Sequence, residues 1–79
     1  MNETKKRLLP RAGTNARIVL DYVRRHPDAD LAEIAIHAGV KEHLARKWLF
    51  ELRREGWVER IEPPPGVIQG SWRYVDESA

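Results

Sequence analysis

The stretch LAEIAIHAGVKEHLARKWLF, from Leu31 to Phe50, decides the fold of this chain. Apolar residues recur at helical spacing in its first part, and Glu33 stands three positions after Asp30 as in a capping box. Gly39 ends this helix, because glycine readily takes the left-handed conformation at a helix C-terminus. A second helical pattern begins one turn later. The stretch therefore predicts two helices joined by a tight glycine turn, over residues 31–38 and 42–55.

The second of these helices has one apolar and one polar face. At about 100° per residue its apolar side chains fall within roughly 140° of arc, and they are Leu44, Ala45, Trp48, Leu49 and Leu52. Gly56 follows the last turn, so we expect the helix to end there in a left-handed cap.

Upstream, the sequence predicts one more helix, over residues 15–26. Thr14 or Asn15 is expected to cap it, and Pro27 stops it because the residue before a proline avoids helical angles. Its apolar face is Ala16, Val19, Leu20 and Val23. Residues 1–13 show no sustained periodicity, and we interpret them as a flexible basic arm.

Downstream, the pattern changes to two short β-type runs, Trp57–Ile61 and Ser71–Val75. The three prolines at residues 63–65 belong to the loop between them, because proline cannot donate to a strand ladder. A hairpin over residues 57–75 is therefore predicted, followed by a polar tail at residues 76–79.

This order of elements resembles the winged helix-turn-helix family. The family's pattern of a small residue, a turn glycine and three apolar residues falls on Ala35, Gly39, Val40, Ala45 and Trp48. Its run from the third helix into the wing is matched by Leu52, Gly56, Trp57, Val58 and Arg60. The resemblance implies a mainly α fold with a small β-hairpin (α+β), as a single three-helix winged helix-turn-helix domain over residues 14–75.

The resemblance also implies that the helix over residues 42–55 is a recognition helix, which enters the major groove of double-stranded DNA. Its expected DNA contacts are Lys41, Glu42, His43, Arg46, Lys47, Phe50 and Arg54. Arg46 is the first choice for guanine, because a guanidinium can donate two bonds to O6 and N7. Arg53 and Arg54 are placed nearer to the backbone than to the bases, or in solvent.

Two of these residues keep alternative interpretations. Glu42 accepts from cytosine N4, or it is simply an acid favoured in the first turn of a helix. Phe50 contacts a thymine methyl group, takes part in a dimer contact, or packs under the wing.

Basic residues of the arm are also expected on DNA, and they are Lys5, Lys6, Arg7 and Arg11. The wing candidates are Arg60, Gln69 and Arg73. Residues 62–70 contain no Lys or Arg but include Val67 and Ile68, which is a departure from wings that bind DNA. Contact with DNA, contact with a protein partner and loop packing all stay open for the wing tip.

Charge and composition exclude several other classes. The 79 residues contain 14 basic and 12 acidic side chains and no cysteine, for a net charge of +2. Residues 1–13 and 41–54 each carry +3, whereas residues 55–79 carry −3. His26, His37 and His43 lack cysteine partners and metal-site spacing, so we expect no metal and no cofactor. Without a nucleophile constellation, phosphate loop or apolar span, we expect neither an enzyme nor a membrane protein.

The sequence hypothesis is thus sequence-specific double-stranded DNA binding by a small transcription regulator or repressor. We expect it in the cytoplasm of a prokaryotic cell or a phage-infected host, as a homodimer on a palindromic site. The alternatives are a winged-helix protein-interaction module, with a partner at the apolar wing tip, and an architectural, recombination or packaging factor of a mobile element.

Overall fold

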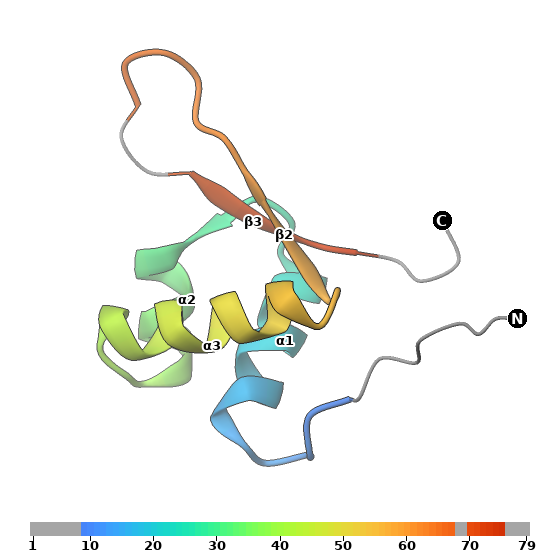
Figure 1. Ribbon diagram of the computed structural model, residues 1–79. Coiled ribbons are helices and arrows are strands. Elements are labelled where there is room, and N and C mark those ends of the chain that lie inside the picture. The colour runs from blue at the N-terminus through green and yellow to red at the C-terminus, as the bar shows by residue number, and fades with distance from the viewer. Residues whose placement is uncertain (1–8, 68–69, 76–79) are drawn as a thin grey trace, which may run out of the picture.

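The computed structural model describes residues 9–67 and 70–75. Its elements, in chain order, are α1 (Asn15–Arg25), β1 (Ala29–Asp30), α2 (Leu31–Ala38), α3 (Glu42–Arg54), β2 (Val58–Ile61) and β3 (Ser71–Tyr74). Figure 1 shows α3 crossing in front of the other helices, with β2 and β3 forming a hairpin whose loop projects away from them. The predicted fold class, a three-helix winged helix-turn-helix domain, is confirmed.

The first two helices are capped by side chains. Thr14 Oγ1 accepts from the backbone N–H of Arg17 at 3.3 Å, at the start of α1. At the start of α2, Asp30 Oδ1 accepts from Glu33 N at 2.9 Å and Glu33 Oε1 accepts from Asp30 N at 3.1 Å. This is the reciprocal capping box expected from the sequence. Both caps satisfy N–H groups that have no partner inside the helix.

Glycine ends both α2 and α3. At Gly39, where φ is 71°, the N–H donates to Ile36 O and the N–H of Val40 donates to Ala35 O, each at 3.1 Å. Gly56, with φ of 88°, repeats this pair of bonds after α3. The first turn brings the chain directly from α2 into α3, with Val40 packed against the core. The helices α1 and α3 end at Arg25 and Arg54, one residue before the ends expected from sequence.

One core joins the three helices to the sheet. Its fully buried side chains include Val19, Leu20 and Val23 from α1, Ile34 from α2, and Leu49 from α3. Two tryptophans, at 7% and 4% exposure, close the core on the sheet side: Trp57 and Trp72. Because α3 is buried along one face only, its other face is left for solvent or a ligand.

The sheet has three strands, in the order β1-β3-β2, with antiparallel pairing throughout. The sequence interpretation missed β1 and expected a two-stranded hairpin. β1 pairs Ala29 with Trp72 and Asp30 with Ser71. Just before it, Asp28 adopts a φ of 69° and donates its N–H to Trp72 O at 3.0 Å. This strand ties the link between α1 and α2 to the base of the wing.

Candidate nucleic-acid interface

The outward face of α3 carries five exposed residues, here named the α3 stripe: His43, Arg46, Lys47, Phe50 and Arg54. They fall on the opposite side of the helix from Ala45, Leu49 and Leu52, which are buried at 0–3% exposure. The periodicity of 3.6 residues per turn produces this separation. Lys41 and Glu42, at the start of the helix, are exposed as well.

The cations of the α3 stripe are not neutralised by their described neighbours. Within residues 9–67 and 70–75, Arg46, Lys47 and Arg54 form no ion pair or side-chain hydrogen bond with one another or with any other residue of those ranges. An exposed ion pair places a negative charge beside the cation and weakens its attraction for another anion. Arg46, Lys47 and Arg54 have no such pair within the described ranges.

The N-terminus of α3 differs from those of the other two helices. Lys41 occupies the N-cap position with extended angles and makes no side-chain capping bond. Glu42 lies in the first turn, where the helix dipole favours an acidic side chain. That position agrees with the dipole interpretation of Glu42, and its contact with cytosine stays a prediction.

Phe50 contacts the wing side of the domain. Its ring meets the ring of Trp72 edge to face, with centroids 5.9 Å apart and planes at 76°. Aromatic pairs favour this geometry. Packing under the wing, one of the three interpretations of Phe50, is thus present, and 47% of the residue is still exposed.

Both arginines of the wing strands are engaged in ion pairs. Arg60 Nη1 lies 3.3 Å from Glu62 Oε2, and Arg73 Nη2 lies 3.4 Å from Asp28 Oδ1. Side chains alternate between the two faces of a strand. Since Trp72 points into the core, Arg73 lies on the outer face of the sheet, away from α3. Gln69 lies outside the described residues.

The wing tip is a tight turn without charged side chains. Val67 N donates to Pro64 O at 3.0 Å, with Gly66 at a φ of 88°. Proline followed by glycine in this conformation is typical of a type II turn, which is conformationally restricted. Val67 is 50% exposed.

A helix-turn-helix with a solvent-facing third helix and a β wing is thus in place, and comparison with known proteins agrees. The family model described as FaeA-like protein matches residues 16–74, which is all of the region from α1 to β3 except the first residue of α1. The chain belongs to the FaeA-like family. This is a winged helix-turn-helix family. No curated protein sequence matches the chain.

A solved structure supports the same fold for this FaeA-like protein. The crystal structure of the PcaV transcriptional regulator from Streptomyces coelicolor, in complex with its natural ligand, superposes with a TM-score of 0.72 at 18% sequence identity. The match covers 89% of the FaeA-like chain and 48% of PcaV, so the chain spans about half of PcaV's length. At this level of identity the likeness to PcaV shows the winged-helix fold.

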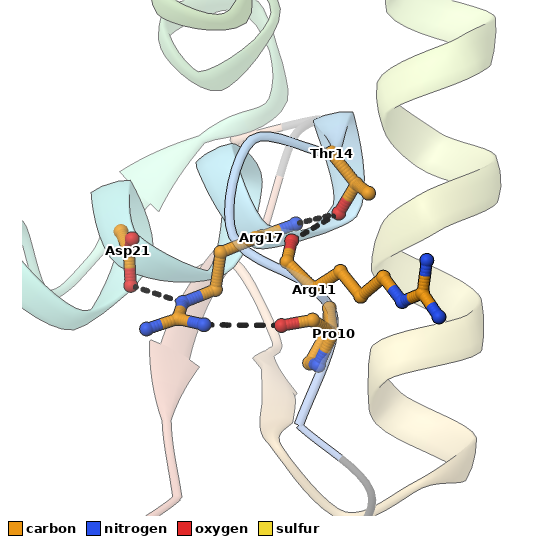
Figure 2. Close-up of polar contacts among 5 residues, drawn as sticks. All are labelled: Pro10, Arg11, Thr14, Arg17 and Asp21. Atoms are coloured by element: carbon orange, nitrogen blue, oxygen red, sulfur yellow. Dashed lines mark hydrogen bonds and ion pairs between the residues drawn. The ribbon is translucent and has the colours of Figure 1, made fainter.

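The start of the described chain in this FaeA-like protein is fastened to α1. Figure 2 shows the contacts: Arg17 Nη1 donates to Pro10 O at 3.0 Å, and Arg17 Nε lies 3.3 Å from Asp21 Oδ1. Thr14 Oγ1 donates to Arg11 O at 2.7 Å. Arg11 is exposed. The other expected arm residues, Lys5, Lys6 and Arg7, lie outside the described residues.

Two positioning residues were missed by the sequence interpretation. Arg17 holds the segment that leads into the arm, and Asp28 holds Arg73 and the start of β1. The spacing of Arg17 and Asp21, four apart on a helix, is a sequence signal for their pair. No local pattern marks the bond to Pro10 or the pairing of Asp28 with a residue 45 positions away.

The rings of His26, at the end of α1, and His37, in α2, each lie 4.4 Å from the ring of Tyr22, centroid to centroid. In the ranges 9–67 and 70–75 no group of three His, Cys, Asp or Glu residues is arranged to hold a metal ion. No helix in these ranges is long and apolar enough to cross a membrane.

Proposed function

We propose that this protein binds double-stranded DNA at specific sequences, with α3 in the major groove, and acts as a small transcription regulator. The observation that carries this proposal is a contrast in charge pairing. The cations of the α3 stripe have no anionic partner in the described chain, whereas both wing-strand arginines do. Positive charge is therefore available on the recognition helix and is compensated on the wing.

The dimensions of α3 suit this role. A helix with its side chains is about 10–12 Å across, and the major groove is about 12 Å wide. Arg46 and Lys47 project from the first two turns, where recognition helices reach base edges. We assign Arg46 to guanine, Lys47 to a base or a phosphate, and Lys41 and His43 to the flanks of the same groove.

The regulator we propose acts in the cytoplasm of a prokaryotic cell, as a repressor on a palindromic operator bound by two copies. The two-copy arrangement is proposed because of the size of the domain. One small module buries too little surface for tight specific binding, and a second copy adds to that surface. Light scattering measures the mass of the protein–operator complex. A mass that corresponds to one copy of the protein per operator would contradict the two-copy arrangement.

A second candidate function is protein interaction, and the wing tip favours it. The turn from Pro64 to Val67 is restricted, uncharged and exposed, and Glu62 at its base is paired with Arg60. Such a surface has no electrostatic attraction to phosphate. An architectural role in recombination or packaging would use the same α3 contacts on DNA as the regulator.

The test of DNA binding is a titration of the protein against duplex DNA at several salt concentrations. With about four to six phosphate contacts, the slope of log affinity against log salt is expected near −0.9 per contact, or roughly −4 to −5 in all. Absence of binding to any duplex at about 50 mM salt would overturn the DNA-binding proposal and leave the protein-interaction role.

A further inference from the structure

The C-terminal half of α3 bears a shallow hollow, separate from Arg46, which we assign to guanine. Phe50, Arg53 and Arg54 line it, and its volume is about 360 Å³. Three side chains at positions i, i+3 and i+4 lie next to one another on a helix surface. The hollow therefore combines one aromatic wall with two guanidinium groups.

The aromatic wall is held in place from below. The ring of Trp72, itself 4% exposed, meets the ring of Phe50 edge to face. The two arginines belong to the last turn of α3, and within the described ranges neither has an ion pair. A fixed apolar wall beside unpaired donors suits a ligand that has both an anionic group and an apolar surface.

Acidic side chains lie on the other side of Arg54. Glu51 and Glu55 line a separate groove together with Arg54, next to Pro10 and Trp57. An anion is repelled from that groove and is attracted to the side of Phe50 and Arg53. The charges around the helix end thus select the hollow as the place for an anion.

Distance along the helix places this hollow at the edge of the groove. At a rise of 1.5 Å per residue, Arg54 lies about 12 Å along the axis from Arg46. The major groove winds around the duplex, so a straight helix that lies along it does not follow its floor over that length. When Arg46 lies over the bases, Arg53 and Arg54 at the far end of α3 are nearer to the sugar-phosphate strand that borders the groove.

We infer that the hollow formed by Phe50, Arg53 and Arg54 holds one phosphodiester unit of the DNA strand beside the major groove. The guanidinium groups of Arg53 and Arg54 donate to its phosphate oxygens, and the face of Phe50 lies against a deoxyribose. This inference rests on the proposed function and divides α3 into a half that reads bases and a half that grips the backbone. The hollow fixes the depth of α3 in the groove without selecting a sequence.

The experiment compares two charge-matched double variants in the full-length protein. Arg53→Gln with Arg54→Gln removes the guanidinium groups of the hollow, and Arg24→Gln with Arg25→Gln removes the same charge from the last turn of α1. Affinity for a selected duplex and for a random duplex is measured by fluorescence anisotropy over a series of salt concentrations. Thermal melting by circular dichroism checks that each variant is folded.

The inference predicts that the first double variant lowers the steepness of the log affinity against log salt plot by about 0.9 to 1.8, for one or two lost phosphate contacts. It lowers the affinity for the selected and the random duplex by the same factor, so the ratio of the two affinities is unchanged. The α1 variant leaves the slope close to that of the wild type.

Three outcomes would overturn the inference. They are an unchanged slope of log affinity against log salt, an equal reduction of that slope by the α1 variant, or a change in the ratio of the affinities for the two duplexes. The last would assign the hollow to base reading. These outcomes are distinct from failure of the proposed function, in which the wild-type protein itself does not bind duplex DNA.

Discussion

Replacing Gly39 by alanine tests whether the left-handed turn between α2 and α3 is needed for the fold. Gly39 has a φ of 71°, and a Cβ built on it meets nothing within 4 Å. The substitution therefore adds backbone strain without a steric clash. For residues with a Cβ, the left-handed conformation costs about 1–2 kcal/mol.

The loss in unfolding free energy should accordingly be about 1–2 kcal/mol. In a domain of this size each kcal/mol corresponds to a change of roughly 4–8 °C in Tm. Gly39→Ala is thus expected to melt about 4–16 °C below the wild type. Gly39→Asn is the matched control, because asparagine tolerates this conformation better, and its loss should be smaller.

Urea denaturation followed by circular dichroism measures both variants, with the slope of the transition as a check on two-state behaviour. Equal losses for alanine and asparagine would refute the assignment to backbone conformation. A loss for Gly39→Ala below about 0.3 kcal/mol would show that the turn does not require a left-handed residue.

Two further stability predictions follow from single contacts. Asp30→Ala removes the capping box of α2 and should lower the free energy of unfolding by about 1 kcal/mol in a urea titration. Lys41→Ala, at an N-cap position without a side-chain bond, should change it by less than about 0.5 kcal/mol. Similar values for both variants would contradict the capping argument. Gly70→Ala places a Cβ 2.5 Å from Ile61 O, so the backbone of the wing must shift. The loss of unfolding free energy, followed by thermal melting, should therefore exceed that of Gly39→Ala. A smaller loss would show that the base of the wing adapts freely.

Much of the helical part of the fold could be predicted because its signals are local. The capping box joins Asp30 to Glu33, and the glycine turn at Gly39 depends on one backbone conformation. The buried stripe of α3 follows from helical periodicity alone. Each of these signals lies within about one turn of the residue it positions.

The sheet could be predicted only in part. β1 has two residues, which is too short to show an alternating pattern, and its partner strand lies more than 40 residues away. The positive φ of Asp28 and its ion pair with Arg73 depend on that pairing. Neither could be inferred from neighbouring residues.

For the candidate site, the outward direction of Arg46 and Lys47 was predictable from periodicity, while their lack of described ion-pair partners was not. The contact of Phe50 with Trp72 depends on how the wing folds back on α3. The engagement of Arg60 by Glu62 likewise required the structure, although these residues are only two positions apart, because strand side chains at that spacing take several rotamers. The assignment of each residue to a base or a phosphate stays a prediction.

The most direct test of the central claim is the effect of Arg46→Ala on the discrimination between a preferred duplex and random DNA. The preferred duplex is first selected by the wild-type protein from a randomised pool, and Arg25→Ala on α1 is the control. Arg46 has no described ion pair, so the variant should fold normally. It should lose about 1–3 kcal/mol of binding free energy on the preferred duplex, or roughly 5- to 150-fold in Kd. The loss on random DNA should be much smaller. Equal losses on both duplexes would contradict the account, because Arg46 would then contact phosphate and α3 would not read the sequence through it.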